Sequence, residues 1–291
     1  MGLPIVRIVV LISLSVRTII SYATAPYQGK GSGETSLFSQ MIGHIANNTL
    51  LLADRYYCTW AILALILQQG GHMLVQNHAH RKPDFTLGQR LGPKDHLITW
   101  KKSKRKPDWL SQKDYDALPD EITIREFVVA GKVYVTTLLD AKRYHRKELF
   151  PLYCGRWQVE LDLRSINTHM KMDILRCKSP ELVQKEIAVH LLAYNLVRAC
   201  IARAATLKGK IPRQLSFMTA VQLLNQGISP LILSAGNLVE HIVNGLLDAI
   251  ASIPIGQQKR QPQSRAIKRR PKPYLLLTIP RNKACKLITT H

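Results

Sequence analysis

The sequence predicts an α/β protein, in which a mixed sheet packs against helices. Two short apolar runs, 49–53 and 73–76, are typical of buried strands. Between them, 58–69 has the composition of a helix packed on that sheet. Further on, 122–129 and 132–139 alternate as the two strands of a β-hairpin do. With 291 residues, 46% of them hydrophobic, the chain is long enough to bury a substantial core.

The N-terminal segment, Leu3 to Ala25, is rich in β-branched residues and predicts two core strands with a turn near Arg17. Its apolar character also raises the question of a membrane span. Arg7 and Arg17 interrupt it, and the uncharged run between them is far shorter than the ~20 residues that a spanning helix needs. We therefore expect no targeting segment here.

A carboxylate follows the first central strand. A glycine-rich loop leads into an expected helix over Glu34–Ile45, and the apolar run Thr49–Ala53 then predicts a buried strand that ends at Asp54. Binding sites of α/β proteins are built where central strands end. Asp54 is therefore a candidate site residue.

The chain after this strand predicts further helices, strands and a basic tail. A helix over 58–69 is stopped by Gly70 and Gly71, and Met73–Gln76 forms the next strand. Ala130-Gly131 is a good turn signal between the two hairpin strands. Helices are expected over Lys147–Met170, Leu182–Leu207, Ser216–Asn225 and Gly236–Ile253, followed by a basic tail over Gln257–Lys286. The predicted division is 1–78 as the first part of the core, 79–145 as a β-rich insertion, 146–210 as the rest of the core, 211–256 as a helical region and 257–291 as the tail.

Charge and cysteine content restrict the partners and the compartment. The chain has 41 lysines and arginines against 19 acidic residues, which gives a formal charge of +22. Such a surplus predicts a polyanionic partner, nucleic acid first and an anionic membrane second. The five cysteines are widely spaced and include no C-x2-C pair, which indicates free thiols in a reducing compartment.

One helical stripe combines the groups that phosphate chemistry requires. On a regular α-helix, Tyr153, Arg156, Glu160 and Asn167 fall within roughly 60° of one another. A carboxylate beside an arginine can hold a divalent metal while the guanidinium binds a phosphate in bidentate fashion. The structural alternative for Glu160 is an ion pair with Arg156 or Arg164 along the helix.

The spacing Y-x2-R-x3-E resembles the signature helix of bacterial insertion-sequence transposases of the DDE type, in the group called insertion-sequence family four. That signature continues as x6-K, whereas this chain has Asn167 at the corresponding place. Nearly the whole chain is covered, because four other segments also resemble this group: Leu50–Tyr57, Gly92–Leu97, Val135–Asp140 and Ile267–Tyr274.

The resemblance implies a ribonuclease-H-like core, incomplete at its N-terminus and split by the insertion. It implies metal-dependent DNA cleavage and strand transfer, with Asp54 and Glu160 as catalytic carboxylates that hold Mg²⁺ or Mn²⁺. It also implies DNA as the partner, both transposon ends and target, with a homodimer on the DNA as one arrangement and no membrane. The compartment that it implies is the bacterial cytoplasm, in association with the nucleoid.

The first carboxylate of the family pattern has no counterpart in this sequence. Glu34 is the one acidic residue ahead of Asp54, and its place at an expected helix start favours a structural role. We therefore expect a transposase that lacks its N-terminal portion, binds metal weakly and cuts DNA poorly. The alternative is a non-catalytic basic module for DNA or RNA, or a cationic protein of membrane surfaces.

Three regions are candidates for DNA contact. Tyr153 and Arg156 resemble residues that hold the phosphate next to the cleavage site. Asn167, further along the same predicted helix, is also a candidate for DNA contact. Trp100 lies beside a basic run, and an aromatic ring next to cations suits an unpaired base; its alternative role is to cover the insertion's small core. The basic residues are Lys101, Lys102, Lys104 and Arg105 in this run, and Lys268, Arg269 and Arg270 in the tail.

Overall fold

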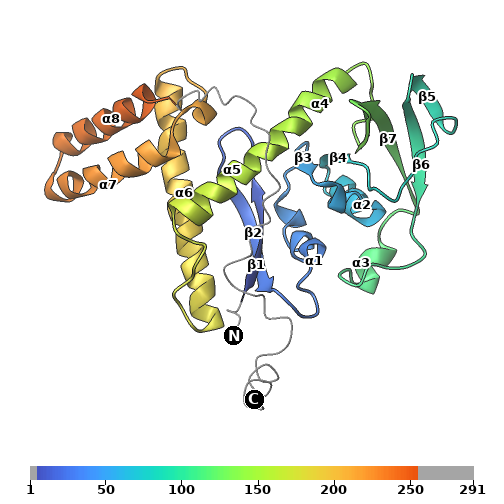
Figure 1. Ribbon diagram of the computed structural model, residues 1–291, viewed down its shortest axis with the longest axis horizontal. Helices are drawn as coiled ribbons and strands as arrows, with labels where there is room; N and C mark the ends of the chain where they lie inside the picture. The colour runs from blue at the N-terminus through green and yellow to red at the C-terminus, as the bar shows by residue number, and fades with distance from the viewer. Residues whose placement is uncertain (1–4, 255–291) are drawn as a thin grey trace, which may run out of the picture.

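The computed structural model describes residues 5–254, and its elements are labelled in Figure 1. In chain order, the elements up to the end of the sheet are β1 (Val6–Ile12), β2 (Ile19–Pro26), α1 (Glu34–Ser39), η1 (Ile42–His44), β3 (Leu50–Ala53), η2 (Arg55–Tyr57), α2 (Trp60–Gln68), β4 (His72–Gln76), β5 (Gln89–Gly92), β6 (Asp95–Lys101), α3 (Gln112–Asp116), β7 (Glu121–Val129) and β8 (Lys132–Thr136). The elements that follow are α4 (Arg146–Cys154), η3 (Gly155–Trp157), α5 (Gln158–Arg164), η4 (Ser165–His169), α6 (Pro180–Leu207), η5 (Pro212–Gln214), α7 (Phe217–Leu233) and α8 (Asn237–Ser252).

A six-stranded mixed sheet with the order β3-β4-β8-β7-β6-β5 forms the centre of the fold. β3 and β4 are parallel, because α2 carries the chain back between them, and every other neighbouring pair in this sheet is antiparallel. Six of the nine residues of α2 are buried, and they share a core cluster with Met73 and Val75 of β4. The predicted α/β class with a mixed sheet is confirmed.

The strands of the β-rich insertion continue the sheet of the core. β8 pairs with β4, so 79–145 does not form a sheet of its own. The hairpin turn at Ala130 and Gly131 is present, with φ of 49° and 72°. A second hairpin, formed by β5 and β6, was not predicted. It turns through Lys94 at φ 52°. Charged residues and Pro93 interrupt the alternation of apolar and polar residues that would have predicted it. The predicted domain boundaries themselves stay a prediction.

The expected N-terminal strands form a separate two-stranded hairpin. β1 pairs antiparallel with β2, and Arg17 takes the left-handed conformation at φ 67° in the turn between them. Because successive side chains of a strand point to opposite faces, the hairpin contributes to two cores. Val9 and Leu11 pack with the core around α1 and α2, whereas Val6 and Ile8 pack with the core around α6.

The expected single helix over 147–170 is a chain of four helical segments. α4 is followed by the 3₁₀ turn η3, then by α5, and finally by the π-helical turn η4. A 3₁₀ turn advances each residue by about 120° instead of about 100°. The stripe geometry of a regular α-helix is therefore wrong in detail here, because residue spacing alone cannot distinguish tighter turns from looser ones.

Three further helices, α6, α7 and α8, pack together beside the hairpin (Figure 1). α7 runs to Leu233, past the predicted end at Asn225 and through Pro230. Among the described residues, α6 is long and apolar enough to cross a membrane, a test that a core helix also passes; its buried face includes Ile187, Leu191 and Ile201. The predicted basic tail lies outside the described residues.

Candidate functional site

Asp54 lies where the sequence places it, directly after β3. Its Oδ1 accepts a hydrogen bond from the backbone N–H of Tyr56 at 3.3 Å, so the carboxylate caps the short turn η2. About half of its side chain is exposed, at 52%. The carboxylate is therefore held in place and remains accessible to solvent.

The helical chain α4–η3–α5 runs beside β3 (Figure 1), and its residue Arg156 reaches the end of this strand. Tyr153 is buried, and its ring meets that of Tyr134 edge-on at 5.1 Å between centroids. The guanidinium of Arg156 lies 5.6 Å from the centre of the Tyr153 ring and 5.4 Å from that of Trp157. Arg156 Nη2 approaches Asp54 Oδ2 to 3.6 Å. Two candidate residues from distant parts of the sequence thus form an ion pair.

Arg156 has an N–H group that its ion pair with Asp54 does not use. Arg156 Nε is buried and has no hydrogen-bond partner among the described residues. Burial raises the pKa of Tyr153, while Arg156 acts in the opposite direction. The pKa of Tyr57 is also raised, first by burial and then by Glu34 and Asp54. Glu34 is therefore close enough to Tyr57 to raise its pKa. It lies in the first turn of α1, where a carboxylate is favoured by the helix dipole.

Glu160 and Asn167 lie further along the same helical chain. Glu160 is exposed in the first turn of α5, and Asn167 is exposed in the π-helical turn η4. Within 5–254, neither side chain takes part in an ion pair or a hydrogen bond, so the alternative of an ion pair for Glu160 is absent there. The structure brings Asp54, Tyr153 and Arg156 together and leaves Glu160 exposed on the next turn.

The donor set suits a hard cation that keeps part of its water shell. The part of the chain that the structure describes contains no group of three or more His, Cys, Asp or Glu residues that would form a complete metal site. Mg²⁺ is usually held by one or two carboxylates together with waters and substrate phosphates. Asp54 and Glu160 are exposed carboxylates, the ligand type that Mg²⁺ prefers.

Sequence reasoning missed a buried carboxylate two residues after Glu160. Asp162 is completely buried, and three arginines surround it. Arg17 Nε donates to Asp162 Oδ1, Arg198 Nη2 lies 3.5 Å from the same oxygen, and Arg213 Nη2 lies 4.0 Å from Oδ2. We call these four residues the Asp162 cluster. It connects α5 with the hairpin turn, α6 and η5.

Neighbouring hydrogen bonds extend the Asp162 cluster to the backbone of the hairpin turn. The hydroxyl of Tyr194 donates to the carbonyl of Arg17 at 2.9 Å, and Arg198 Nε donates to that hydroxyl at 3.0 Å. One sequence signal was available, because Arg198 shares the helical stripe of Ile187, Leu191, Tyr194 and Ile201. An arginine in a buried apolar stripe needs a partner.

Trp100 is not placed for the DNA contact expected of it. Trp100 is 4% exposed, its Nε1 donates to Glu126 at 3.1 Å, and the guanidinium of Arg81 covers its ring at 3.5 Å. The ring is therefore part of the core, as the alternative expectation had it, and is not available for stacking on a base. Trp109 likewise packs against the core.

The basic residues that follow Trp100 fall into two groups, those that contact other parts of the protein and those that are exposed without a partner among the described residues. Lys102 Nζ is bound to the carbonyl of Leu118 at 2.8 Å, and Lys101 lies 3.8 Å from Glu121. Lys104 and Arg105 are exposed, and no described carboxylate lies within ion-pair distance of them. These two are the members best placed to meet a phosphate backbone. Lys268, Arg269 and Arg270 lie outside the described residues.

Comparison with known proteins identifies the family. The family model described as "Transposase DDE domain" matches residues 3–196. The transposase InsG for insertion sequence element IS4 of Escherichia coli K12 is 30% identical over 250 residues, which are 84% of this chain and 55% of that protein. The putative transposase InsL of IS186A from the same strain and the Escherichia coli transposase of IS421 are each 35% identical over 68 residues, 23% of this chain and 18% of those proteins.

The similarity covers only part of the length of these relatives. The chain spans 55% of the length of the IS4 transposase, and no solved structure shows a significant match to it. The matched domain contains Asp54, Tyr153, Arg156 and Glu160, and so covers the whole candidate site. The mixed sheet, the carboxylate at the end of β3 and the arginine beside it agree with that match, and the chain belongs to the DDE transposase family.

Proposed function

We propose that this chain acts on DNA as a transposase of the DDE type, by metal-dependent phosphodiester cleavage and strand transfer. One observation carries the proposal: Arg156 lies 3.6 Å from Asp54, next to the buried Tyr153 and one helical turn before Glu160. This arrangement combines a metal-binding carboxylate with a guanidinium that has an unused N–H group. DNA, as transposon end and as target, is the substrate that fits these groups and the charge of +22.

Each residue has a separate task in this proposal. Asp54 and Glu160 hold Mg²⁺ or Mn²⁺ through their exposed oxygens. When bound, the metal activates the attacking oxygen and stabilises the leaving oxygen of the phosphodiester. Arg156 donates hydrogen bonds to the phosphate next to the cleaved bond, and its position depends on the buried ring of Tyr153. Lys104 and Arg105 contact the DNA backbone further away.

The alternative is a DNA-binding module derived from a transposase that cuts poorly or not at all. Two observations favour it. Arg156 already neutralises Asp54 in this structure, so it competes with a metal for that carboxylate. Asn167 is exposed at the place where the family signature has a lysine, and an asparagine cannot supply the cationic phosphate contact of a lysine.

A nicking assay separates the two functions. The chain is incubated with supercoiled plasmid that carries its transposon ends, in the presence of Mg²⁺ or Mn²⁺, and compared with Asp54→Asn and Glu160→Gln variants. Nicking that needs the metal and is lost in both variants supports the transposase. Binding of the ends without nicking by the unaltered chain supports the module, and absence of DNA binding rejects both.

We further propose that the chain works in the bacterial cytoplasm at the nucleoid, where the DNA is. This placement agrees with the four described cysteines, all of which are free thiols. A homodimer on the DNA stays a prediction that sedimentation of the protein–DNA complex would test.

A further inference from the structure

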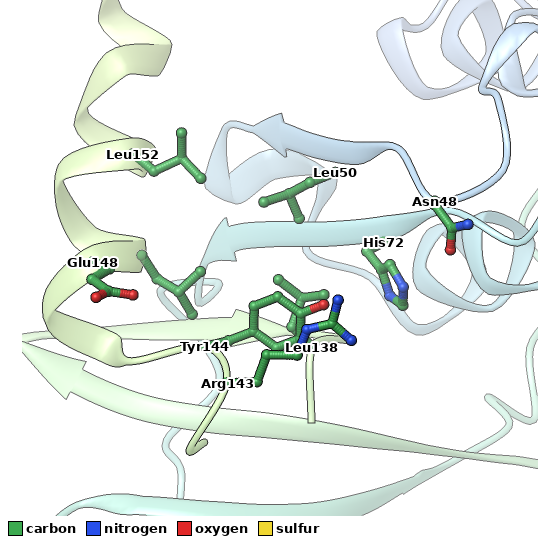
Figure 2. A pocket seen from close by; sticks show the side chains of 9 residues that line it. Asn48, Leu50, His72, Leu138, Arg143, Tyr144, Glu148 and Leu152 are labelled. Atoms are coloured by element: carbon green, nitrogen blue, oxygen red, sulfur yellow. The ribbon is translucent and has the colours of Figure 1, made fainter. Parts of the chain in front are cut away.

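A cavity of about 730 Å³ lies at the opposite end of β3 from Asp54. Its wall includes Asn48 and Leu50 at the start of β3 and His72 at the start of β4, as Figure 2 shows. The rest of the wall comes from the loop after β8 and from the first turns of α4. Its volume is in the range of small-molecule sites in proteins, and it is separate from the proposed catalytic residues.

The lining is apolar in the middle and polar at its ends. Four leucines and the ring of Tyr144 form the apolar surface; the leucines are Leu50, Leu138, Leu149 and Leu152. Figure 2 shows Glu148 on α4 at one side of the cavity and His72 and Asn48 at the other. An occupant therefore needs an apolar body with distinct polar groups at its two ends.

His72 presents a polar imidazole ring at one of these ends. Its Nδ1 lies 3.3 Å from the hydroxyl of Thr137, and that oxygen already accepts a hydrogen bond from the backbone N–H of Met73 at 2.9 Å. The donor and acceptor roles of these two groups depend on the tautomer of the ring. Together with the amide of Asn48, His72 offers polar groups to an occupant of the cavity.

Arg143 supplies the positive charge of the cavity. Its backbone N–H is bound to Asp140 Oδ1 at 3.0 Å, so the loop is fixed through the main chain. The guanidinium is exposed, and no carboxylate among the described residues lies within ion-pair distance of it. Lys142 neighbours Arg143 in the sequence but does not line the cavity. An anionic group is the ligand that the guanidinium of Arg143 attracts.

We propose that this cavity binds one nucleotide, either free or as an unpaired nucleotide of a DNA strand. The phosphate meets Arg143, the base lies against the leucines and Tyr144, and an exocyclic amino group of the base donates to Glu148. An inorganic phosphate would leave the apolar wall in contact with water, and an acidic peptide would be repelled by Glu148. The DNA source rests on the proposed function, whereas the free nucleotide does not.

Calorimetry with dCMP and dTMP and fluorescence anisotropy with DNA test this assignment. The DNA ligands are a blunt duplex and the same duplex with a short cytosine overhang. Arg143→Ala is matched by Lys142→Ala, which removes the same charge one residue away from the lining. We expect Arg143→Ala to weaken dCMP binding by more than about tenfold and Lys142→Ala by at most about twofold. Glu148→Gln should abolish a preference for dCMP over dTMP, and Arg143→Lys should restore part of the affinity.

Each outcome has a separate meaning. Tighter binding of the overhang duplex than of dCMP, lost in Arg143→Ala, identifies the DNA strand as the source, and equal affinities identify the free nucleotide. Equal losses in Arg143→Ala and Lys142→Ala, or no binding of dCMP together with equal binding of blunt and overhang duplexes, would overturn the inference and leave the proposed function intact. If the chain binds dCMP with the expected pattern but binds no DNA, the proposed function fails and the nucleotide pocket stands.

Discussion

Arg156 and Asp54, which lie far apart in the sequence, form an ion pair across the end of β3 with 3.6 Å between Nη2 and Oδ2. The arginine side chain is 18% exposed and the aspartate side chain 52%, so the guanidinium is the fixed partner and the carboxylate faces solvent. This asymmetry suits an exchange in which Asp54 turns to a metal ion while Arg156 takes up a phosphate.

Replacement of Arg156 should strengthen metal binding and weaken DNA binding. A neighbouring cation repels a divalent metal from Asp54, so Arg156→Ala should tighten Mn²⁺ binding by roughly fivefold at low salt. The same variant loses its phosphate contact and should bind DNA less tightly. Electron paramagnetic resonance of free Mn²⁺ measures the first effect. Arg164→Ala, which removes an exposed arginine of α5, is the control, and equal Mn²⁺ affinity in both variants would contradict the exchange.

The Asp162 cluster predicts a large loss of stability when its carboxylate is removed. Asp162→Asn leaves Arg17 and Arg198 buried without a negative charge beside them, and should lower the free energy of unfolding by about 3–5 kcal/mol. Urea denaturation followed by circular dichroism measures the change. Asp173→Asn alters an exposed acid and should stay within about 0.5 kcal/mol of the unaltered protein. Similar values for the two variants would show that the cluster contributes little.

Cys58 predicts a loss of stability at alkaline pH. Burial raises the pKa of its thiol to about 11 in the folded chain, against an unfolded value of about 8.5. Between these values the folded state binds more protons than the unfolded state. The free energy of unfolding therefore falls as pH rises from about 8.5 to about 11, by at most ~1.4 kcal/mol per pH unit.

Urea midpoints measured across this pH range test the effect of Cys58. Cys58→Ala should lose less stability over the range than the unaltered protein, because it lacks the buried thiol. Cys154→Ala removes an exposed thiol and should keep the original pH dependence. An unchanged pH dependence in Cys58→Ala would assign the alkaline loss to other groups.

Trp100 should matter for stability and not for DNA affinity. Trp100→Phe removes the hydrogen bond to Glu126 and part of the ring beneath Arg81, and should cost about 1–3 kcal/mol. Thermal unfolding and anisotropy with duplex DNA measure the two properties. Trp157→Phe, at a ring that is 59% exposed, is the stability control. A large loss of DNA affinity in Trp100→Phe at unchanged stability would restore the base-stacking role.

Local sequence patterns were sufficient for much of the fold. Apolar runs and glycine stops located β3, α2 and β4, and the Ala130-Gly131 turn located the hairpin of β7 and β8. These features depend on residues close together in the chain. The hairpin of β5 and β6 was missed because it is stabilised by the pairing of β6 with β7. The segment 89–101 is charged and contains a proline, so it has no alternating pattern that would predict this pairing.

Residue patterns alone were enough to predict the family, the mixed α/β class and the candidates Asp54, Arg156 and Glu160. The different environments of the acidic residues in one helical segment came from contacts between distant parts of the chain. Glu160 and Asp162 are two residues apart in the same short helix, yet the first is exposed and the second completely buried. The physical reason is the placement of Arg17, Arg198 and Arg213, which come from three other elements and stabilise a carboxylate at one of these positions.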